Sequence, residues 1–151
     1  IDEDVNSPSR VIFCSGKIFY ELDDYRKQMK IKNIKIVRIE QLYPFPFDTL
    51  GAVISKHKDC EFLWVQEEPK NMGPWGFVKS RIRHLFTKYK LDQKIHYVGR
   101  KRAAAPATGI AKRHNANQEL IKQISLQASL KRVIKERIGV SFMKFKNLPR
   151  D

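Results

Sequence analysis

Short polar groups follow the apolar runs of this chain, and they are the first candidates for chemistry. The groups are Ser15-Gly16-Lys17, Glu40-Gln41, Gln66-Glu67-Glu68 and Gly99-Arg100. A glycine and a lysine that lead into a helix can hold an anion through backbone N–H groups and the ammonium. The sequence has neither the first glycine of a P-loop nor a GxGxxG pattern. Ser15 and Lys17 are therefore either an anion contact or ordinary turn residues.

Glu67 and Glu68 have the residue types of a general acid and base pair. Neighbouring side chains on an extended segment point to opposite faces, so these two carboxylates cannot easily flank one substrate bond. We expect at most one of them to join a site. The alternative is an ion pair or an interface contact.

The histidines and cysteines form no catalytic or metal-binding pattern. None of His57, His84, His96 and His114 follows a nucleophile-elbow motif, and no zinc-ligand spacing is present. We expect a solvated His84, a His57 whose positive charge suits a helix C-terminus, and a ligand contact at His114 at most. Cys14 and Cys60 lie in or beside apolar runs, which predicts buried, reduced thiols and a reducing compartment.

The charge of the chain is unevenly distributed. It carries 30 Lys and Arg against 16 Asp and Glu, a net charge of +14. Residues 1–50 hold eight basic and eight acidic side chains, residues 51–100 ten and five, and residues 101–151 twelve and three. A module that binds nucleic acid or an acidic partner is thus an alternative, and its affinity would fall steeply with salt. Aromatic stacking platforms do not interleave with the basic residues, so a solvated helix surface is the favoured reading.

The elements that must position these residues alternate along the chain. Apolar runs at residues 11–14, 34–39, 62–65 and 95–98 are typical of strands covered on both faces. Apolar residues then recur at helical spacing in three segments. The first follows residue 17, the second follows Asp48, which is the expected N-cap, and the third runs from residue 75 to about 90. This alternation predicts βαβ units, and so an α/β fold whose mostly parallel sheet has helices on both faces.

The C-terminal part is expected to begin with a loop over residues 100–113. A last helix should follow from about residue 115, with Leu120, Ile121, Ile124 and Ala128 facing inward. Residues 1–9 are predicted to be a linker, 10–129 the folded domain, and 130–151 a basic amphipathic extension or tail. The chain begins at Ile1, so we expect a piece of a longer protein. No apolar run approaches the ~18–20 residues that span a bilayer, so no membrane partner is expected.

Several segments together resemble one family. Residues 37–46 read VRIEQLYPFP, 64–75 read WVQEEPKNMGPW, 97–100 read YVGR and 103–109 read AAAPATG, with CSGK at 14–17 before them and His114 after them. In this order they resemble the C-terminal domain of the thiamine-diphosphate-dependent first component of the 2-oxoglutarate dehydrogenase complex. The resemblance covers about residues 10–129.

The resemblance implies a three-layer α/β/α sandwich of the transketolase C-terminal type, with a mostly parallel, mixed sheet of four to five strands. It implies a homodimeric full chain that decarboxylates 2-oxoglutarate and passes the succinyl group to the lipoyl arm of the succinyltransferase component, in the tricarboxylic acid cycle. Thiamine diphosphate and Mg would be bound by the upstream domains. This chain would then hold no catalytic, cofactor-binding or metal residues and would be inactive alone, in the bacterial cytoplasm or the mitochondrial matrix.

The expected role is therefore assembly and regulation. The residues expected to contact an anionic effector, a nucleotide or acetyl-CoA, are Ser15, Lys17, Arg100 and His114. The residues expected at dimer or interdomain contacts are Arg38, Glu40, Glu67, Glu68 and Asn71. The small residues at 103–109 predict a closely packed contact. A sister enzyme of the same fold, a transketolase or a branched-chain 2-oxo acid dehydrogenase, is a further alternative.

Overall fold

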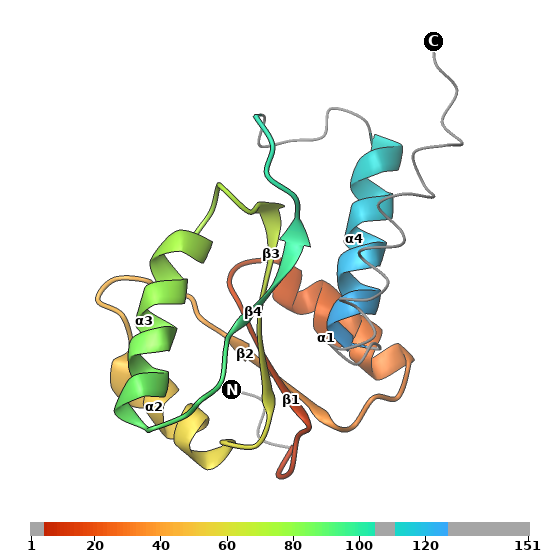
Figure 1. The fold of residues 1–151 in the computed structure, drawn as a ribbon. Coiled ribbons are helices and arrows are strands. Elements are labelled where there is room, and N and C mark those ends of the chain that lie inside the picture. Colours follow the sequence, from red (N-terminus) through yellow and green to blue (C-terminus); the bar gives the residue numbers. More distant parts are fainter. Residues whose placement is uncertain (1–4, 105–110, 127–151) are drawn as a thin grey trace.

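A parallel sheet lies between two layers of helices (Figure 1). The computed structural model describes residues 5–104 and 111–126, with the backbone alone for residues 111–114. The elements in chain order are β1 (Arg10–Cys14), α1 (Ile18–Gln28), β2 (Ile34–Arg38), α2 (Phe47–Lys56), β3 (Glu61–Pro69), α3 (Trp75–Lys88), β4 (His96–Arg100) and α4 (Ala111–Leu126). The expected three-layer α/β/α sandwich is confirmed.

The described strands form one four-stranded sheet in the order β2-β1-β3-β4, and all neighbouring pairs are parallel. Ile12 of β1 pairs with Ile36 on one side and with Leu63 on the other. The chain first moves from β1 outward to β2, and then crosses back to β3 and on to β4. The direction of winding therefore changes between β1 and β3, which is the position where open α/β sheets usually bind ligands.

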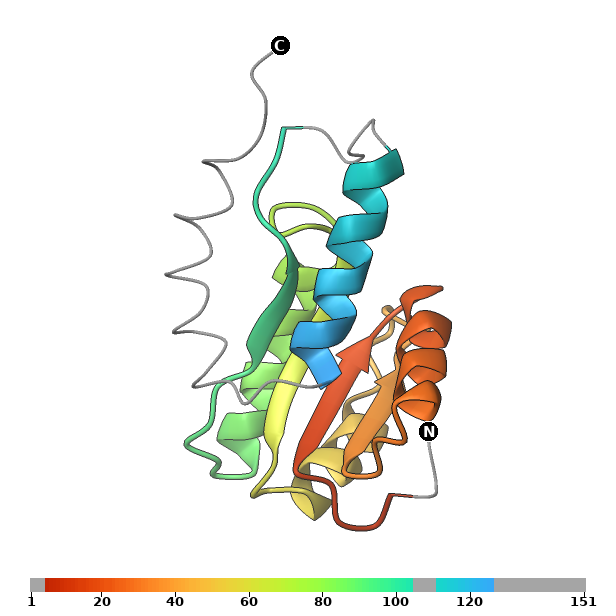
Figure 2. The same ribbon diagram turned by 90° about the vertical axis from the view of Figure 1, so that its right-hand side faces the viewer.

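Alternate residues of each strand enter two separate cores. Helices α1 and α4 cover one face of the sheet, and α2 and α3 cover the other (Figure 2). Phe13, Phe62 and Trp64 pack on the α2/α3 side, whereas Ile12 and Leu63 pack on the α1/α4 side. The strands must be apolar on both faces because water reaches neither, and this explains the continuous apolar runs.

Two helix predictions are wrong. The expected N-cap Asp48 lies inside the first turn of α2, because the carbonyl of Pro46 already accepts the first helical hydrogen bond, from the N–H of Leu50 (3.0 Å). Helix α4 begins at Ala111, within the segment expected to be a loop. Residues 105–110 lie outside the described part of the chain.

The inner face of α4 differs in part from the prediction. Its buried residues are Gln118, Ile121, Ser125 and Leu126. The inward prediction is thus confirmed for Ile121, and Ile124 also packs against the α1/α4 core. Leu120 lies about 100° from Ile121 around the helix and is 42% exposed. The apolar pattern was misleading at Leu120, because two polar residues are among the buried ones. Ala128, also expected inward, lies outside the described residues.

The chain before β1 packs on the domain as far as it is described. The N–H of Ser9 donates to the carbonyl of Asn33 (2.8 Å), and Val5 is buried.

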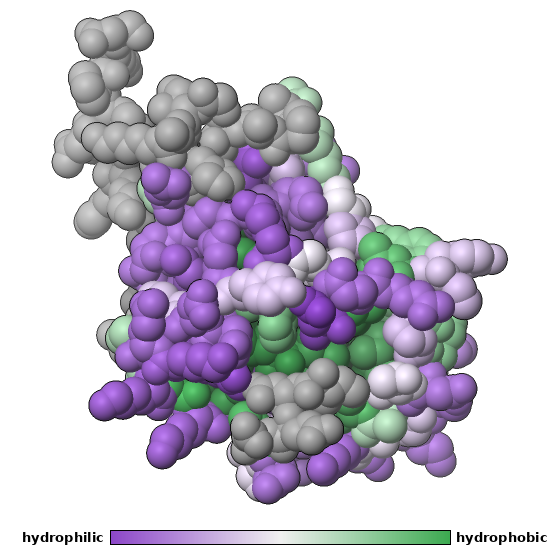
Figure 3. Space-filling model, turned by 180° about the vertical axis from the view of Figure 1, so that it is seen from behind, coloured by the Kyte–Doolittle hydropathy of each residue, from purple (hydrophilic) through white to green (hydrophobic). Residues whose placement is uncertain are grey.

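No helix in the described ranges is long and apolar enough to cross a membrane. Figure 3 shows the molecule from behind, where apolar residues lie between hydrophilic ones. Residues 127–151, which include the expected basic extension, lie outside the described part.

Ile82 and Leu120 offer a matched test of these cores. Ile82 is fully buried in the core on the α2/α3 side, whereas Leu120 is 42% exposed. Ile82→Ala should lower the free energy of unfolding by about 2–5 kcal/mol, because it leaves a cavity. Leu120→Ala should change it by less than about 1 kcal/mol. Urea unfolding followed by circular dichroism measures both, and equal losses would contradict the described face of α4.

Candidate functional site at the carboxyl edge of the sheet

An ion pair lies at the position between β1 and β3 where the winding reverses. Lys17 Nζ is 3.2 Å from Glu67 Oε1, and the Gln118 side-chain amide of α4 donates to the same carboxylate oxygen. The hydrogen bond and charge of Glu67 raise the pKa of Lys17. The Lys17 side chain is 67% exposed and the Glu67 side chain 20%. Lys17 before α1, Glu67 of β3 and Gln118 of α4 are therefore joined to one another at this edge.

The turn after β1 is held by a carboxylate from the neighbouring strand end. Gly16 has φ +75°, a conformation that glycine adopts without strain. Its N–H donates to Glu40 Oε1 (3.3 Å), and the same oxygen lies 3.2 Å from Arg38 Nε. Glu40 thus joins the ends of β1 and β2 and places negative charge beside the start of α1, where the helix dipole favours it.

Arg38 forms an aromatic cluster with the first turn of α1. Its guanidinium donates to the Tyr20 hydroxyl (2.7 Å) and lies 4.9 Å from the Phe19 ring centre. The bond to Tyr20 raises the pKa of Arg38. Tyr20 is 59% exposed, so this cluster reaches the surface with its side chains already ordered.

Gln66 is a structural centre of this edge, although the sequence indicated no role for it beyond its place in the polar group at 66–68. Its side-chain oxygen accepts from Trp64 Nε1 (2.8 Å), and its amide donates to the carbonyls of Met72 (2.8 Å) and Pro69 (3.2 Å). The residue is 2% exposed. It closes the loop between β3 and α3 onto the sheet. The available signal was its position as the first polar residue after an apolar run.

Glu67 and Glu68 face opposite sides, as their spacing predicted. Glu67 faces Lys17 and α4, whereas the Glu68 side chain lies beside Gly73. A Cβ at Gly73 would lie 3.1 Å from the Glu68 carboxyl carbon, and its φ is +66°. The two carboxylates therefore cannot act on one bond.

Asn71 binds the start of the small-residue segment within the same chain. Its side-chain amide donates to the carbonyl of Ala103, and the N–H of Ala103 donates back to its oxygen, both at 3.0 Å. The close packing expected at 103–109 stays a prediction, because of this segment only Ala103 and the exposed Ala104 are described. Residues 105–110 lie outside the described part.

The four residues expected to contact an effector lie in three separate parts of the fold. Ser15 and Lys17 lie at the β1 end, and Arg100 ends β4, two strands away in the sheet order. The Arg100 carbonyl accepts from the N–H of Lys70 (3.1 Å). His114 lies in the first turn of α4, and its side chain is outside the described residues. The effector contacts remain predictions.

Both thiols are buried, whereas His84 lies at the surface. Burial, with a contribution from Glu40, raises the pKa of Cys14 to about 12. Cys60 donates its S–H to the carbonyl of Pro8 (2.7 Å), and both cysteines are free and buried, as predicted. His84 is exposed, as predicted. Within the described residues, no three His, Cys, Asp or Glu side chains gather to hold a metal ion.

The expectation for His57 is wrong. The residue follows α2 directly but is only 5% exposed, so burial opposes the positive charge that the helix dipole would favour. Burial and the charges of Lys35 and Lys56 lower the pKa of His57. Burial also lowers the pKa of His96. Sequence periodicity could not show that the residue after the helix packs inward.

Gln66→Leu should destabilise the domain by about 1–3 kcal/mol, because Trp64 Nε1 and two loop carbonyls lose their buried partner. Gln41→Leu is the matched control, since Gln41 is exposed. The midpoint of urea unfolding, read from tryptophan fluorescence, checks both variants. An unchanged midpoint for Gln66→Leu would show that its bonds do not hold the loop.

Acid should destabilise the domain through His57. Its folded-state pKa is lowered, so the unfolded chain binds more protons as the pH falls from about 7 to about 5, and stability is lost over that interval. His57→Gln should reduce this loss, whereas His84→Gln on the exposed face should not. Urea midpoints at the two pH values measure the difference. Equal pH dependence in the His57→Gln and wild-type proteins would contradict the assignment.

Comparison with known proteins shows which family this chain resembles. Residues 2–126 match the family described as 2-oxoglutarate dehydrogenase C-terminal. The oxoglutarate dehydrogenase of Buchnera aphidicola is 42% identical over 127 residues, which are 83% of this chain and 14% of that protein. The 2-oxoglutarate dehydrogenase E1 component of Rickettsia felis is 40% identical over 122 residues, 80% of this chain and 12% of that protein.

A third relative agrees with these two. The 2-oxoglutarate dehydrogenase E1 component of Brucella anthropi is 41% identical over 111 residues, which are 71% of this chain and 11% of that protein. The chain therefore spans only 11–14% of the length of these relatives. Since the family match includes every described strand and helix, the chain belongs to the 2-oxoglutarate dehydrogenase C-terminal family.

Proposed function

We propose that this chain is the assembly and regulatory domain at the C-terminus of a 2-oxoglutarate dehydrogenase first component. The family match over residues 2–126 carries the proposal, because it covers both cores and the whole carboxyl edge. The same match favours this enzyme over a transketolase or a branched-chain 2-oxo acid dehydrogenase. A cytoplasmic location in a bacterium, or a mitochondrial one in a eukaryote, goes with the proposal.

The whole protein would decarboxylate 2-oxoglutarate on thiamine diphosphate and transfer the succinyl group to the succinyltransferase component. The cofactor would be held by upstream domains of the same protein, as the resemblance implies. Within the described residues of this chain, no three His, Cys, Asp or Glu side chains gather to hold a metal ion. This chain would contribute surfaces rather than reacting groups.

The exposed part of the carboxyl edge has the chemistry of a protein contact. Tyr20 is 59% and Tyr43 84% exposed, and Arg38 is held against Tyr20 by a hydrogen bond. Tyrosine and arginine are enriched at the energetic centres of interfaces. Because Arg38 is already ordered, binding would cost little additional side-chain entropy.

A regulatory anion would meet a specific competitor at Lys17. The ammonium is two-thirds exposed and pairs with Glu67 at 3.2 Å. An effector phosphate or carboxylate at Lys17 would compete with Glu67 for the ammonium. Ser15, Lys17, Arg100 and His114 stay the proposed effector contacts.

The full-length protein that contains this sequence tests the proposal. It should turn over 2-oxoglutarate with thiamine diphosphate, Mg²⁺ and ferricyanide as electron acceptor, whereas the isolated chain should show neither turnover nor calorimetric heat with thiamine diphosphate. Turnover by the isolated chain would contradict the proposal. So would a full-length protein that is inactive on 2-oxoglutarate.

The assembly role is tested in the same protein with Arg38→Ala. This variant should weaken subunit association by about tenfold or more in sedimentation velocity, as expected for an interface arginine. The isolated domain should lose less than about 1 kcal/mol of stability, because its exposed pairs contribute little. Arg83→Ala on the exposed face of α3 is the control. Unchanged association of Arg38→Ala would exclude this edge as the contact.

A further inference from the structure

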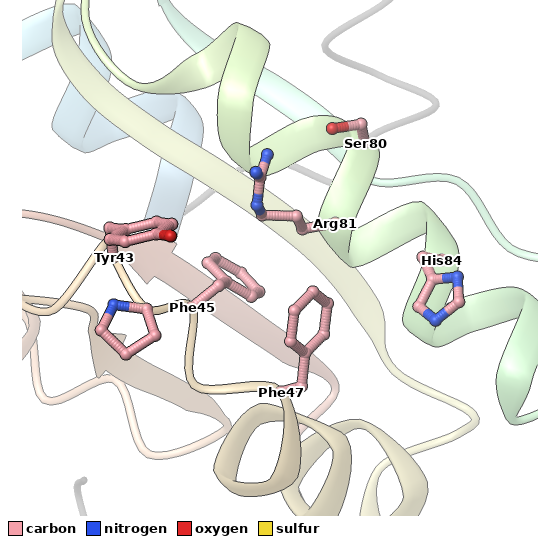
Figure 4. A pocket seen from close by; sticks show the side chains of 7 residues that line it. Tyr43, Phe45, Phe47, Ser80, Arg81 and His84 are labelled. Carbon is pink, nitrogen blue, oxygen red and sulfur yellow. The ribbon is translucent and has the colours of Figure 1, made fainter.

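A pocket of about 560 Å³ lies on the α2/α3 face of the domain, between α3 and the segment that leads into α2. Figure 4 shows its walls. Aromatic side chains of Tyr43, Phe45 and Phe47 line one side, and Ser80, Arg81 and His84 of α3 line the other. Its volume falls within the roughly 300–1,000 Å³ typical of small-molecule sites.

The apolar part of the pocket is a set of aromatic rings in fixed edge-to-face contact. Phe45 is 7% exposed, and its ring centre lies 5.0 Å from that of Phe47 and 6.3 Å from that of Phe77. The Phe47 ring also contacts the His84 imidazole at 5.9 Å. Tyr43 is 84% exposed and stands at the rim. A flat apolar group could stack on these rings with little rearrangement.

The polar part of the pocket is positively charged and ordered. Arg81 donates to the carbonyl of Phe77 (2.9 Å), and its guanidinium lies 3.2 Å from the Phe77 ring centre. Helix α3 contains no Asp or Glu, and within the described residues none of the ion pairs involves Arg81 or His84. Asp48 follows Phe47 in the chain but does not line the pocket.

We propose that this pocket binds a carboxylate monoanion with a flat apolar body. The guanidinium fork of Arg81 matches a carboxylate, and its single formal charge balances one negative charge. A phosphate monoester carries about −1.5 to −2 and would leave an excess of charge in the site. The aromatic wall accepts the apolar body. This site uses no residue of the proposed assembly surface except the exposed Tyr43.

Two sources could supply this chemistry. One is a small organic acid, and the other is the free C-terminal carboxylate of a polypeptide that ends in an aromatic residue. The probes are therefore 3-phenylpropionate, its uncharged amide, phenyl phosphate, and the tripeptide N-acetyl-Gly-Gly-Phe. The ¹H–¹⁵N correlation spectrum of the 151-residue chain reports each titration at residues 43–47 and 80–84.

The carboxylate should bind saturably with a Kd on the order of a millimolar, and the amide about tenfold more weakly or not at all. Arg81→Gln should weaken carboxylate binding about tenfold, and Tyr43→Ser severalfold. Arg83→Gln, on the same helix but outside the pocket, should bind as the wild type does. Tighter binding of the tripeptide would identify a polypeptide terminus as the source, and tighter binding of 3-phenylpropionate a small acid.

Several outcomes would overturn the proposal. They are equal binding of acid and amide, tighter binding of phenyl phosphate than of the carboxylate, equal losses in Arg81→Gln and Arg83→Gln, and no saturable shift with either carboxylate. Circular dichroism verifies that each variant is folded. If Arg81→Gln does not fold, the acid–amide comparison on the wild type and the Tyr43→Ser titration decide the question.

Discussion

Burial of the strands on both faces is the constraint on which the structure depends. The central residues of β1 and β3 are fully or almost fully inaccessible, because α1 and α4 cover one face and α2 and α3 the other. Between two helix layers a polar side chain has no water to bind, so such groups collect where the strands leave the sheet. The carboxyl edge is polar for this reason, whatever the domain binds there.

The polar groups of that edge act chiefly on one another. Glu40 links the ends of β1 and β2, Glu67 links β3 to α1 and α4, and Gln66 ties the loop after β3 to the sheet. Exposed ion pairs of this kind contribute little stability individually. Their effect is geometric, since together they hold three strand ends and two helices in one arrangement. A rigid edge is suited to contact with another protein surface.

The two proposed surfaces differ in their physical character. The edge cluster of Tyr20 and Arg38 is open and carries its own carboxylate, Glu40, so it suits a broad contact with mixed polarity. The pocket beside α3 is concave, and its lining holds a guanidinium and no carboxylate. That difference in shape and charge separates a docking role for the first from ligand binding for the second.

The sequence by itself determined the element order, the two-faced strands and the family, because apolar runs and helical spacing are local properties of the chain. It also placed Glu67 and Glu68 on opposite sides and buried both cysteines. It placed Ile121 inward on α4 but missed the burial of Gln118 and Ser125 on the same helix, and it missed the inward packing of His57. Only the tertiary structure decided that Lys17 meets Glu67, that Gln66 closes its loop, and that Arg81 lines the same pocket as Phe45 and Phe47. Each of these contacts joins elements whose relative placement is set by packing, which no local pattern encodes.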